Sequence, residues 1–366
     1  MNISAFRKWF SHGLLLVLFL CLQPFSLHAD DAGVRWTEER VASWYQSLGW
    51  LNGINYIPSD AVNYTAMWDK TSFNPTQIEK ELALAESIGL NTVRVVLQYA
   101  VYADDPAHFL DTLEKFLAIC QRHGIRVVPC FFDDCVFGVN TDPSIGRQSE
   151  PLEGWYAWAW SPSPGHSMVV DQRTHPLLEK YVKAVIGKFR NDPRILLWDL
   201  YNEPTSGLGD RSLPLLKSLF AWARELQPSQ PLTTGFWNGS KKLNAFLTQN
   251  ADVISFHCYG DRAEMAKQIQ QLRKHKRPII CTEWMNRPKK STVASVMPLL
   301  KEERVGSLMW GLVNGKTQTH LPWGHRPEKL PYTGKWQHDL YHRDLKPYDA
   351  AEIELIRKLN GLDASK

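Results

Sequence analysis

Residues 195–204 read Ile-Leu-Leu-Trp-Asp-Leu-Tyr-Asn-Glu-Pro, an apolar run of strand length that ends in a polar tripeptide. Proline lacks a backbone N–H and disfavours helical geometry in the residue before it. We therefore expect a buried strand that stops at Pro204, with Glu203 held extended at its end. A carboxylate at the end of a buried strand is costly unless it has partners or a task. From this stretch alone, an ion-paired structural glutamate and a functional one are equally good interpretations.

Strand-like and helical segments alternate along the chain on both sides of this stretch. Apolar strands are expected at residues 51–57, 92–98, 126–132, from 195, and at 232–236, 253–257, 279–283 and 305–313. Amphipathic helices are expected at residues 74–88, 105–123, 177–190, 213–226, 241–249, 262–275, 292–303 and 350–359. The helix that follows the first strand shows typical signals, with Asn74 before a proline in the first turn and Gly89 at the stop.

The alternation predicts an α/β fold with parallel strands. Because the strands are almost continuously apolar, both of their faces should be buried. Eight strand–helix units fit a (β/α)8 TIM barrel, with long loops after the third and eighth strands. A doubly wound sheet is the competing architecture, but residues 53–56, which end the first strand, do not form the Gly-rich loop that such a fold often has. No linker divides the chain, so we expect a single domain over residues 30–366.

The first 29 residues have the pattern of a secretory signal peptide. Arg7 and Lys8 precede an apolar stretch, Leu14 to Leu22, that is too short for a mature transmembrane helix. Residues 27–29 fit a cleavage site that ends at Ala29. We therefore expect a secreted or periplasmic protein that keeps no stable membrane anchor after cleavage, and we expect a monomer.

The composition excludes some classes of partner. The formal net charge is +4, falling to +2 without Arg7 and Lys8, and no basic patch stands out, so nucleic acid is not expected as a partner. The 15 Trp exceed what packing requires, and flat rings stack well on the apolar faces of sugars.

The six Cys form neither a disulfide framework nor a zinc spacing. Cys130 and Cys135 are either free thiols or a pair across a turn.

The carboxyl ends of the predicted strands carry polar and ionisable residues, although the strand bodies are apolar. In a (β/α)8 barrel the active site forms at these ends. The residues expected there are Asn55, Arg94, Asp133, Asp134, Asn202, Glu203, His257, Tyr259, Glu283 and Trp310. Glu203 and Glu283, on the fourth and seventh strands, would face each other across the barrel mouth. Two such carboxylates can flank a glycosidic bond as acid and nucleophile.

These motifs resemble those of the clan A retaining glycoside hydrolases, in outline the cellulase-like and mannanase-like members of family 5. The resemblance is carried by Thr92-Val93-Arg94-Val95, Asn202-Glu203-Pro204, His257-Cys258-Tyr259, Thr282-Glu283-Trp284 and Met309-Trp310-Gly311. It implies a β-glycosidase that needs no metal or other cofactor and acts on an oligo- or polysaccharide. It also implies that Glu203 is the acid/base and Glu283 the nucleophile.

The resemblance implies supporting roles as well. Asn202 would bind the sugar 2-hydroxyl, and Trp310 would form the floor of the cleavage subsite. Tyr259, in the same motif as His257, would position the nucleophile, and Arg94 would keep the nucleophile ionised. A cation and a hydroxyl donor beside Glu283 would keep it charged. The pKa of an acid beside another negative charge in an aromatic pocket would be raised.

The end of the third strand departs from the family pattern. Family 5 members usually place a His there, whereas this chain has Asp133 and Asp134. The pair would either bind sugar hydroxyls or cap a loop. The Asn-Tyr of the first strand and the stretch from Trp336 to Tyr348 are closer to bacterial cellulase-like proteins that are labelled as xylanases or family-2-like barrels.

Two long loops carry further candidates for sugar binding. The loop after the third strand contains Trp155, Tyr156, Trp158 and Trp160. Alternate spacing would place Trp158 and Trp160 on one side of an extended segment as a stacking platform, and a small satellite core is the alternative. The loop after the eighth strand adds Lys316, His320, Trp323 and Trp336. Such loops favour a pocket for short oligosaccharides or exo-action over an open groove.

The sequence therefore predicts a retaining β-glycosidase acting on a β-linked glucan, mannan or related saccharide. A non-catalytic carbohydrate-binding barrel that uses the Trp surplus for recognition is one alternative. A transglycosylase, in which a sugar rather than water resolves the intermediate, is the other.

Overall fold

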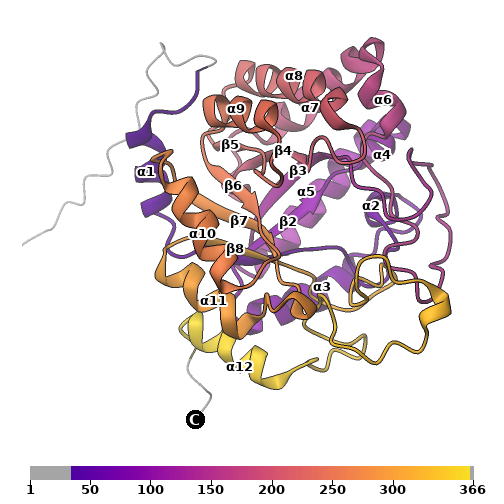
Figure 1. Ribbon diagram of the computed structural model, residues 1–366. Helices are drawn as coiled ribbons and strands as arrows, with labels where there is room; N and C mark the ends of the chain where they lie inside the picture. The colour runs from indigo at the N-terminus through magenta and orange to yellow at the C-terminus, as the bar shows by residue number, and fades with distance from the viewer. Residues whose placement is uncertain (1–33, 363–366) are drawn as a thin grey trace, which may run out of the picture. The chain divides into compact units, whose positions relative to one another are not determined.

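The computed structural model describes residues 34–362 (Figure 1). The predicted signal peptide and the predicted domain boundary at residue 30 lie outside this range and stay predictions. Within it, no helix has both the length and the apolar character that crossing a bilayer requires.

The described residues contain a barrel of eight parallel strands, as the sequence predicts. The strands are β1 (Asn52–Asn55), β2 (Thr92–Val96), β3 (Arg126–Asp133), β4 (Trp198–Asn202), β5 (Leu232–Thr233), β6 (Ile254–His257), β7 (Ile279–Trp284) and β8 (Gly306–Trp310). Their order is β5-β4-β3-β2-β1-β8-β7-β6. The circle closes next to β5, where the Phe236 N–H donates to Ser255 O and the His257 N–H donates to Phe236 O. The (β/α)8 prediction is confirmed.

Helices follow the strands and lie outside them in Figure 1. The α-helices are α1 (Glu38–Gln46), α2 (Tyr64–Trp68), α3 (Pro75–Ser87), α4 (Tyr99–Asp104), α5 (Pro106–Arg122), α6 (His166–Val170), α7 (His175–Phe189), α8 (Leu213–Glu225), α9 (Lys241–Asn250), α10 (Arg262–Arg273), α11 (Val293–Glu302) and α12 (Ala350–Leu359). Short 3-10 turns cover Gln172–Thr174, Gly209–Ser212, Arg287–Lys289 and Pro327–Lys329. The eight expected helices all form, and α1, α2, α4 and α6 are additional.

Most strands are shorter than predicted, and β5 and β8 show why. The β5 prediction of 232–236 ends at Thr233, because residues beyond it keep only an isolated bridge to β6. The β8 prediction of 305–313 ends at Trp310, because the chain turns at Gly311 with φ of +85°. A Cβ at Gly311 would also lie 2.1 Å from Asp339 Oδ1, so this turn needs glycine.

Buried apolar side chains form two clusters. The larger one fills the space between the strands and the helices. The smaller one joins Trp36 and Val41 to Val128, Leu197 and Leu308 of the barrel.

The strand register aligns the ends at which the candidate site residues lie. The aligned pairs are Asn55 with Arg94, Asn55 with Trp310, Asp133 with Asn202, and His257 with Glu283. Because the strands are parallel, these residues share one rim of the barrel.

Candidate active site

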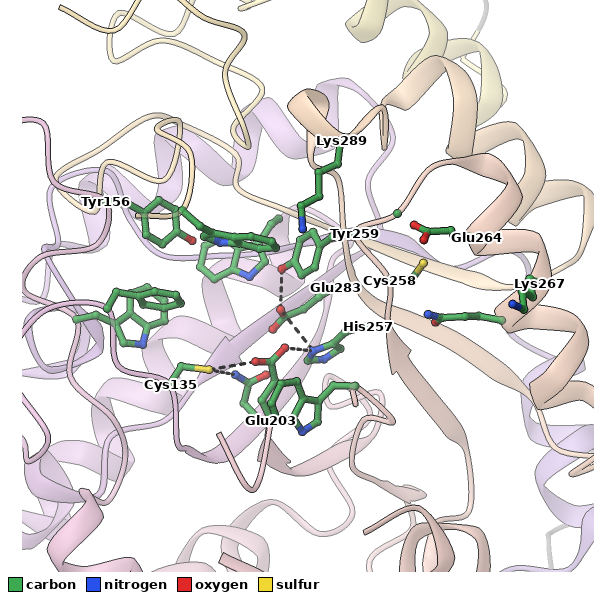
Figure 2. A pocket seen from close by; sticks show the side chains of 18 of the residues that line it. Cys135, Tyr156, Glu203, His257, Cys258, Tyr259, Glu264, Lys267, Glu283 and Lys289 are labelled. Carbon is green, nitrogen blue, oxygen red and sulfur yellow. Dashed lines mark hydrogen bonds and ion pairs between the residues drawn. The ribbon is translucent and has the colours of Figure 1, made fainter. Parts of the chain in front are cut away.

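A cavity of 610 Å³ lies at the carboxyl ends of the strands (Figure 2). Of the predicted site residues, those that line it are Asn202, Glu203, His257, Tyr259, Glu283, Trp160 and Trp310. The lining does not include the other predicted site residues, which are Asn55, Arg94, Asp133, Asp134 and Trp158. Residues of the first group can contact a ligand in this cavity, whereas those of the second can act on it only through other side chains.

Glu203 follows the last residue of β4 in a left-handed conformation, with φ of +42°. The prediction of an extended residue is therefore wrong. Such a conformation costs about 1–3 kcal/mol and persists only where the surroundings hold it. Here the Thr205 N–H donates to Asp134 Oδ2 at 3.0 Å and the Ser206 N–H donates to Glu203 O at 3.1 Å. These bonds fix the turn and direct the Glu203 side chain into the cavity.

Asp133 and Asp134 are both fully buried and bind the protein itself. Asp134 accepts from the Tyr201 hydroxyl at 2.6 Å and from the Ser212 hydroxyl, in addition to Thr205. The expectation that the pair binds sugar hydroxyls does not fit, because neither Asp133 nor Asp134 lines the cavity. The loop-capping interpretation fits Asp134. Burial raises the pKa of each carboxyl to about 6, and the hydrogen bonds that each accepts oppose that rise.

Glu283 is held by two fixed donors. Arg94 Nη1 donates to its Oε1 at 2.9 Å, and the Tyr259 hydroxyl donates to its Oε2 at 2.7 Å. Burial lowers the pKa of Arg94, but Asp199 and Glu283 more than offset this, so the pKa is raised and the guanidinium stays charged. Glu283 therefore faces a permanent positive charge.

Arg94 also organises the residues behind the cavity. Its Nε donates to Asp199 Oδ2, its Nη1 to Asn55 Oδ1 and its Nη2 to Asn202 Oδ1, each at 2.8 Å. Asn55 in turn links Arg94 to β7, because its Nδ2 donates to the carbonyl of Thr282 at 2.7 Å. Asn55 is thus a structural link rather than a ligand contact.

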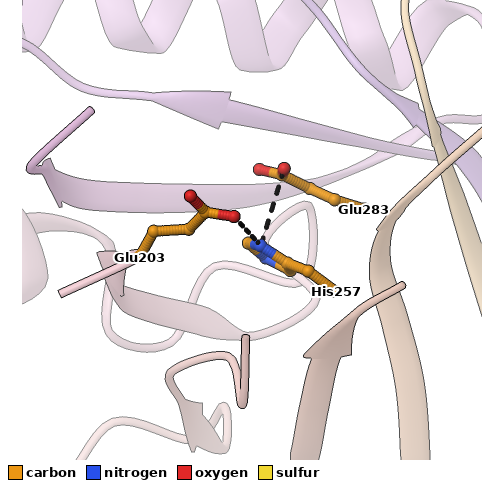
Figure 3. A group of neighbouring side chains, drawn as sticks. All are labelled: Glu203, His257 and Glu283. Atoms are coloured by element: carbon orange, nitrogen blue, oxygen red, sulfur yellow. Dashed lines mark hydrogen bonds and ion pairs between the residues drawn. The ribbon is translucent and has the colours of Figure 1, made fainter. Parts of the chain in front are cut away.

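His257 lies between the two glutamates (Figure 3). Its Nδ1 lies 2.8 Å from Glu203 Oε1 and 3.5 Å from Glu283 Oε2. Burial lowers the pKa of His257, but the charge of Glu283 and the hydrogen bond to Glu203 outweigh it, so the pKa is raised. Burial raises the pKa of Glu203, but the His257 hydrogen bond outweighs it, so the pKa is lowered. The prediction of a raised pKa for Glu203 is wrong, because it left out the proton on Nδ1.

The same three side chains could in principle hold a metal ion, since one ligand atom from each lies within 4.8 Å of the others. The 2.8 Å between His257 Nδ1 and Glu203 Oε1 is shorter than the spacing of two ligands on one tetrahedral zinc ion, roughly 3.4 Å. The distance is that of a hydrogen bond. The prediction that no metal is needed stays a prediction.

Aromatic rings form one wall of the cavity. Trp310 lies 5.8 Å from Trp160, centroid to centroid, and Tyr156 and Trp323 also line the cavity. Trp158 packs on Trp155 instead, with centroids 4.6 Å apart. The paired platform is therefore wrong, because Ala157 turns the chain with φ of +47° and removes the alternation of an extended segment.

The opposite wall is polar. It consists of side chains from α10 and the segment after β7, namely Glu264, Lys267, Gln268, Gln271 and Lys289. From the loop after β8, Lys316 pairs with Glu150 and His320 packs against Trp336, and neither lines the cavity.

His338 and Cys135 were not recognised as site residues from the sequence. His338 stacks behind Trp310, with centroids 5.8 Å apart, and burial lowers its pKa to about 3. Its Nδ1 donates to Met285 O at 2.7 Å, so the ring is neutral and fixed. No periodic pattern marks the irregular segment that carries it.

Cys130 and Cys135 are free thiols, so they do not form a pair, and Cys135 lines the cavity.

The model of the TIM-barrel domain of glycosyl hydrolase family 2 matches residues 71–340. This chain belongs to that family. The resemblance to clan A glycoside hydrolases is thereby confirmed.

Curated relatives cover parts of the chain. Mannan endo-1,4-beta-mannosidase F of Aspergillus clavatus is 22% identical over 50% of this chain and 34% of its own length. Beta-glucuronidase of Pongo abelii is 26% identical over 47% of this chain and 23% of its own length. The matches thus span about a third or less of these two relatives.

Solved structures share the fold. An exo-beta-1,4-mannosidase from Opitutaceae bacterium strain TAV5 has a TM-score of 0.59 at 17% identity, covering 85% of this chain and 59% of that one. An endo-beta-1,4-mannanase from Thermotoga petrophila has a TM-score of 0.56 at 15% identity, covering 86% of this chain and 77% of that one.

The turn that carries Glu203 gives a prediction about stability. Asp134→Ala removes the acceptor of the Tyr201 and Ser212 hydroxyls, and should lower the free energy of unfolding by about 3 kcal/mol. Urea unfolding measures the loss. Asp210→Ala is the matched control, because Asp210 pairs with Lys242 at the surface and its loss should change little. Equal stability of the two variants would contradict the role assigned to Asp134.

Proposed function

We propose that this glycoside hydrolase is a retaining β-glycosidase acting on a β-linked glucan, mannan or related oligo- or polysaccharide. The observation that carries the proposal is the separation of the two glutamates. An oxygen of Glu203 lies within 4.8 Å of one of Glu283. Retaining enzymes hold their carboxyl groups about 5–5.5 Å apart, whereas inverting enzymes need about 6.5–9.5 Å to admit a water. The short spacing supports double displacement.

In the first step Glu283 attacks the anomeric carbon. Arg94 and Tyr259 suit it to this role, because both stabilise the ionised carboxylate. As the carbon–oxygen bond to the leaving group breaks, Glu203 donates a proton to the departing oxygen. The product of this step is a glycosyl ester on Glu283 and a free leaving group that carries the proton.

The proton for this step has a source next to Glu203. The raised pKa of His257 keeps a proton on the ring, 2.8 Å from Glu203 Oε1. We infer that it passes to Glu203 as the glycosidic oxygen of the substrate arrives between the carboxylates. In the second step the Glu203 carboxylate takes a proton from water, and the hydroxyl displaces Glu283 to release the sugar with its original β configuration.

The cavity supports a saccharide ligand. Trp310, Trp160 and Trp323 offer apolar faces, and the polar wall along α10 offers hydrogen-bonding groups to hydroxyls. Because the relatives are named as a mannosidase and a glucuronidase, aryl β-mannosides and β-glucuronides belong beside β-glucosides in the first substrate panel.

The assignment of the two glutamates predicts opposite rescue products. Glu283→Ala should lose turnover of a 2,4-dinitrophenyl β-glycoside, and added azide should restore it as the α-glycosyl azide. Glu203→Ala should yield the β-glycosyl azide, because azide then resolves the intermediate on Glu283. NMR of the products decides between them. Full activity of Glu283→Ala without azide would end the assignment.

Wild-type stereochemistry provides an independent prediction. NMR recorded in the first minutes of hydrolysis should show the β anomer before mutarotation. An initial α product from a β-substrate would exclude the retaining mechanism, whichever residues carry it out.

We also propose export of the protein to the periplasm or medium. The proposal is supported by the charged and apolar pattern of residues 1–29. N-terminal sequencing of protein recovered from the periplasmic or medium fraction should begin at Asp30, and a chain retained in the cytoplasm with residues 1–29 intact would contradict it.

A further inference from the structure

The loop after β3 brings a thiol to Glu203. Cys135 Sγ donates to Glu203 Oε2 across 3.3 Å, while His257 Nδ1 lies 2.8 Å from Glu203 Oε1 (Figure 2). Each carboxylate oxygen therefore has its own donor. The two differ in kind, because a thiol is a weak donor and an imidazole N–H is a strong one.

Buried hydrogen bonds fix the position of this thiol. The Cys135 N–H donates to Asp133 Oδ1 at 3.0 Å, and the same oxygen accepts from Asn202 Nδ2 at 2.8 Å. The other oxygen of Asp133 accepts from Trp160 Nε1 at 3.0 Å. Cys135 is only 7% exposed, yet it lines the cavity. Asp133 thus sets Asn202 and Cys135 in a fixed relation to Glu203.

The thiol stays protonated beside the carboxylate. Burial raises the pKa of Cys135, and the negative charges of Asp133 and Glu203 raise it further. It therefore acts here as an S–H donor and not as a nucleophile.

We propose that Cys135 is a positioning residue for the acid/base, holding Glu203 Oε2 so that Oε1 exchanges the proton with the substrate. The proposal rests on the proposed function of Glu203. A weak donor suits this place, because Glu203 must alternate between carboxyl and carboxylate during the cycle. A strong donor on Oε2 would favour the carboxylate and oppose the acid step.

Other titratable groups act on Glu203 or on Cys135 from several sides of the barrel mouth. They are Arg94 from β2, Asp133 at the end of β3, His257 from β6, Tyr259 after β6 and Glu283 from β7. All of them stay in place when Cys135 alone is replaced, so differences among Cys135 variants report on the donor to Oε2.

The test compares Cys135→Ala and Cys135→Ser with wild type. The high-pH limb of kcat/KM reports loss of the proton from the acid. This limb should lie at higher pH in Cys135→Ala, by about 0.5–1 pH unit, and at lower pH in Cys135→Ser, since a hydroxyl is the stronger donor. For a substrate with a poor leaving group, kcat should fall about tenfold in Cys135→Ala. For a 2,4-dinitrophenyl glycoside, which needs no acid, it should not fall.

Cys120→Ala is the matched control, because Cys120 is a fully buried thiol in α5 outside the cavity and its loss should not move the limb. Coincident limbs for wild type, Cys135→Ala and Cys135→Ser would overturn the proposal. An equal loss on both classes of leaving group would also overturn it. If Cys135→Ala does not fold, the shift in Cys135→Ser alone decides.

Glu203→Gln run in parallel separates this proposal from the proposed function. It should lose about 10²–10⁴-fold on the poor leaving group. Full activity of Glu203→Gln would remove the acid/base assignment itself. If Glu203→Gln loses activity but the high-pH limb does not move in the Cys135 variants, only the role of the thiol is removed.

Discussion

The buried guanidinium of Arg94 is the constraint on which the barrel mouth depends. It joins β2 to Asn55 of β1, to Asp199 and Asn202 of β4, and to Glu283 of β7. A charge buried this deeply is stable only with its partners in place, and loss of one partner costs about 3–5 kcal/mol. The strands that carry the two glutamates are therefore fixed against each other by a guanidinium that also donates to one of them, Glu283.

This shared cation makes the environments of the two glutamates unequal. Glu283 accepts hydrogen bonds from the Arg94 guanidinium and the Tyr259 hydroxyl, two donors that keep their protons. Glu203 receives a proton-carrying ring on one oxygen and a weakly donating thiol on the other. A group with permanent donors suits a nucleophile, and a group with exchangeable donors suits an acid/base. The proposed roles of nucleophile and acid/base thus follow from the groups that surround each carboxylate.

Strand periodicity was sufficient to predict the barrel and the residues on its rim, because parallel strands bring their carboxyl ends together whatever the details of packing. The conformation of Glu203 was beyond that reasoning. The local effect of Pro204 favours an extended residue, and it is overridden by Asp134, a carboxylate nearly seventy positions earlier in the chain. The stacking expected of Trp158 failed for a similar reason, since one left-handed residue, Ala157, cancels the alternation.

The aromatic wall of the cavity depends on contacts of another kind. Trp310 ends β8, but Trp160 on one side of it and His338 on the other come from long irregular segments. The position of His338 depends on Arg287, whose guanidinium donates to the carbonyls of His338 and Asp339 and to Glu352 of α12. The positions of the two glutamates thus follow from strand register, while the shape of the cavity follows from tertiary contacts of loops. This is why the residues predict a reaction class more readily than they predict which sugar is bound.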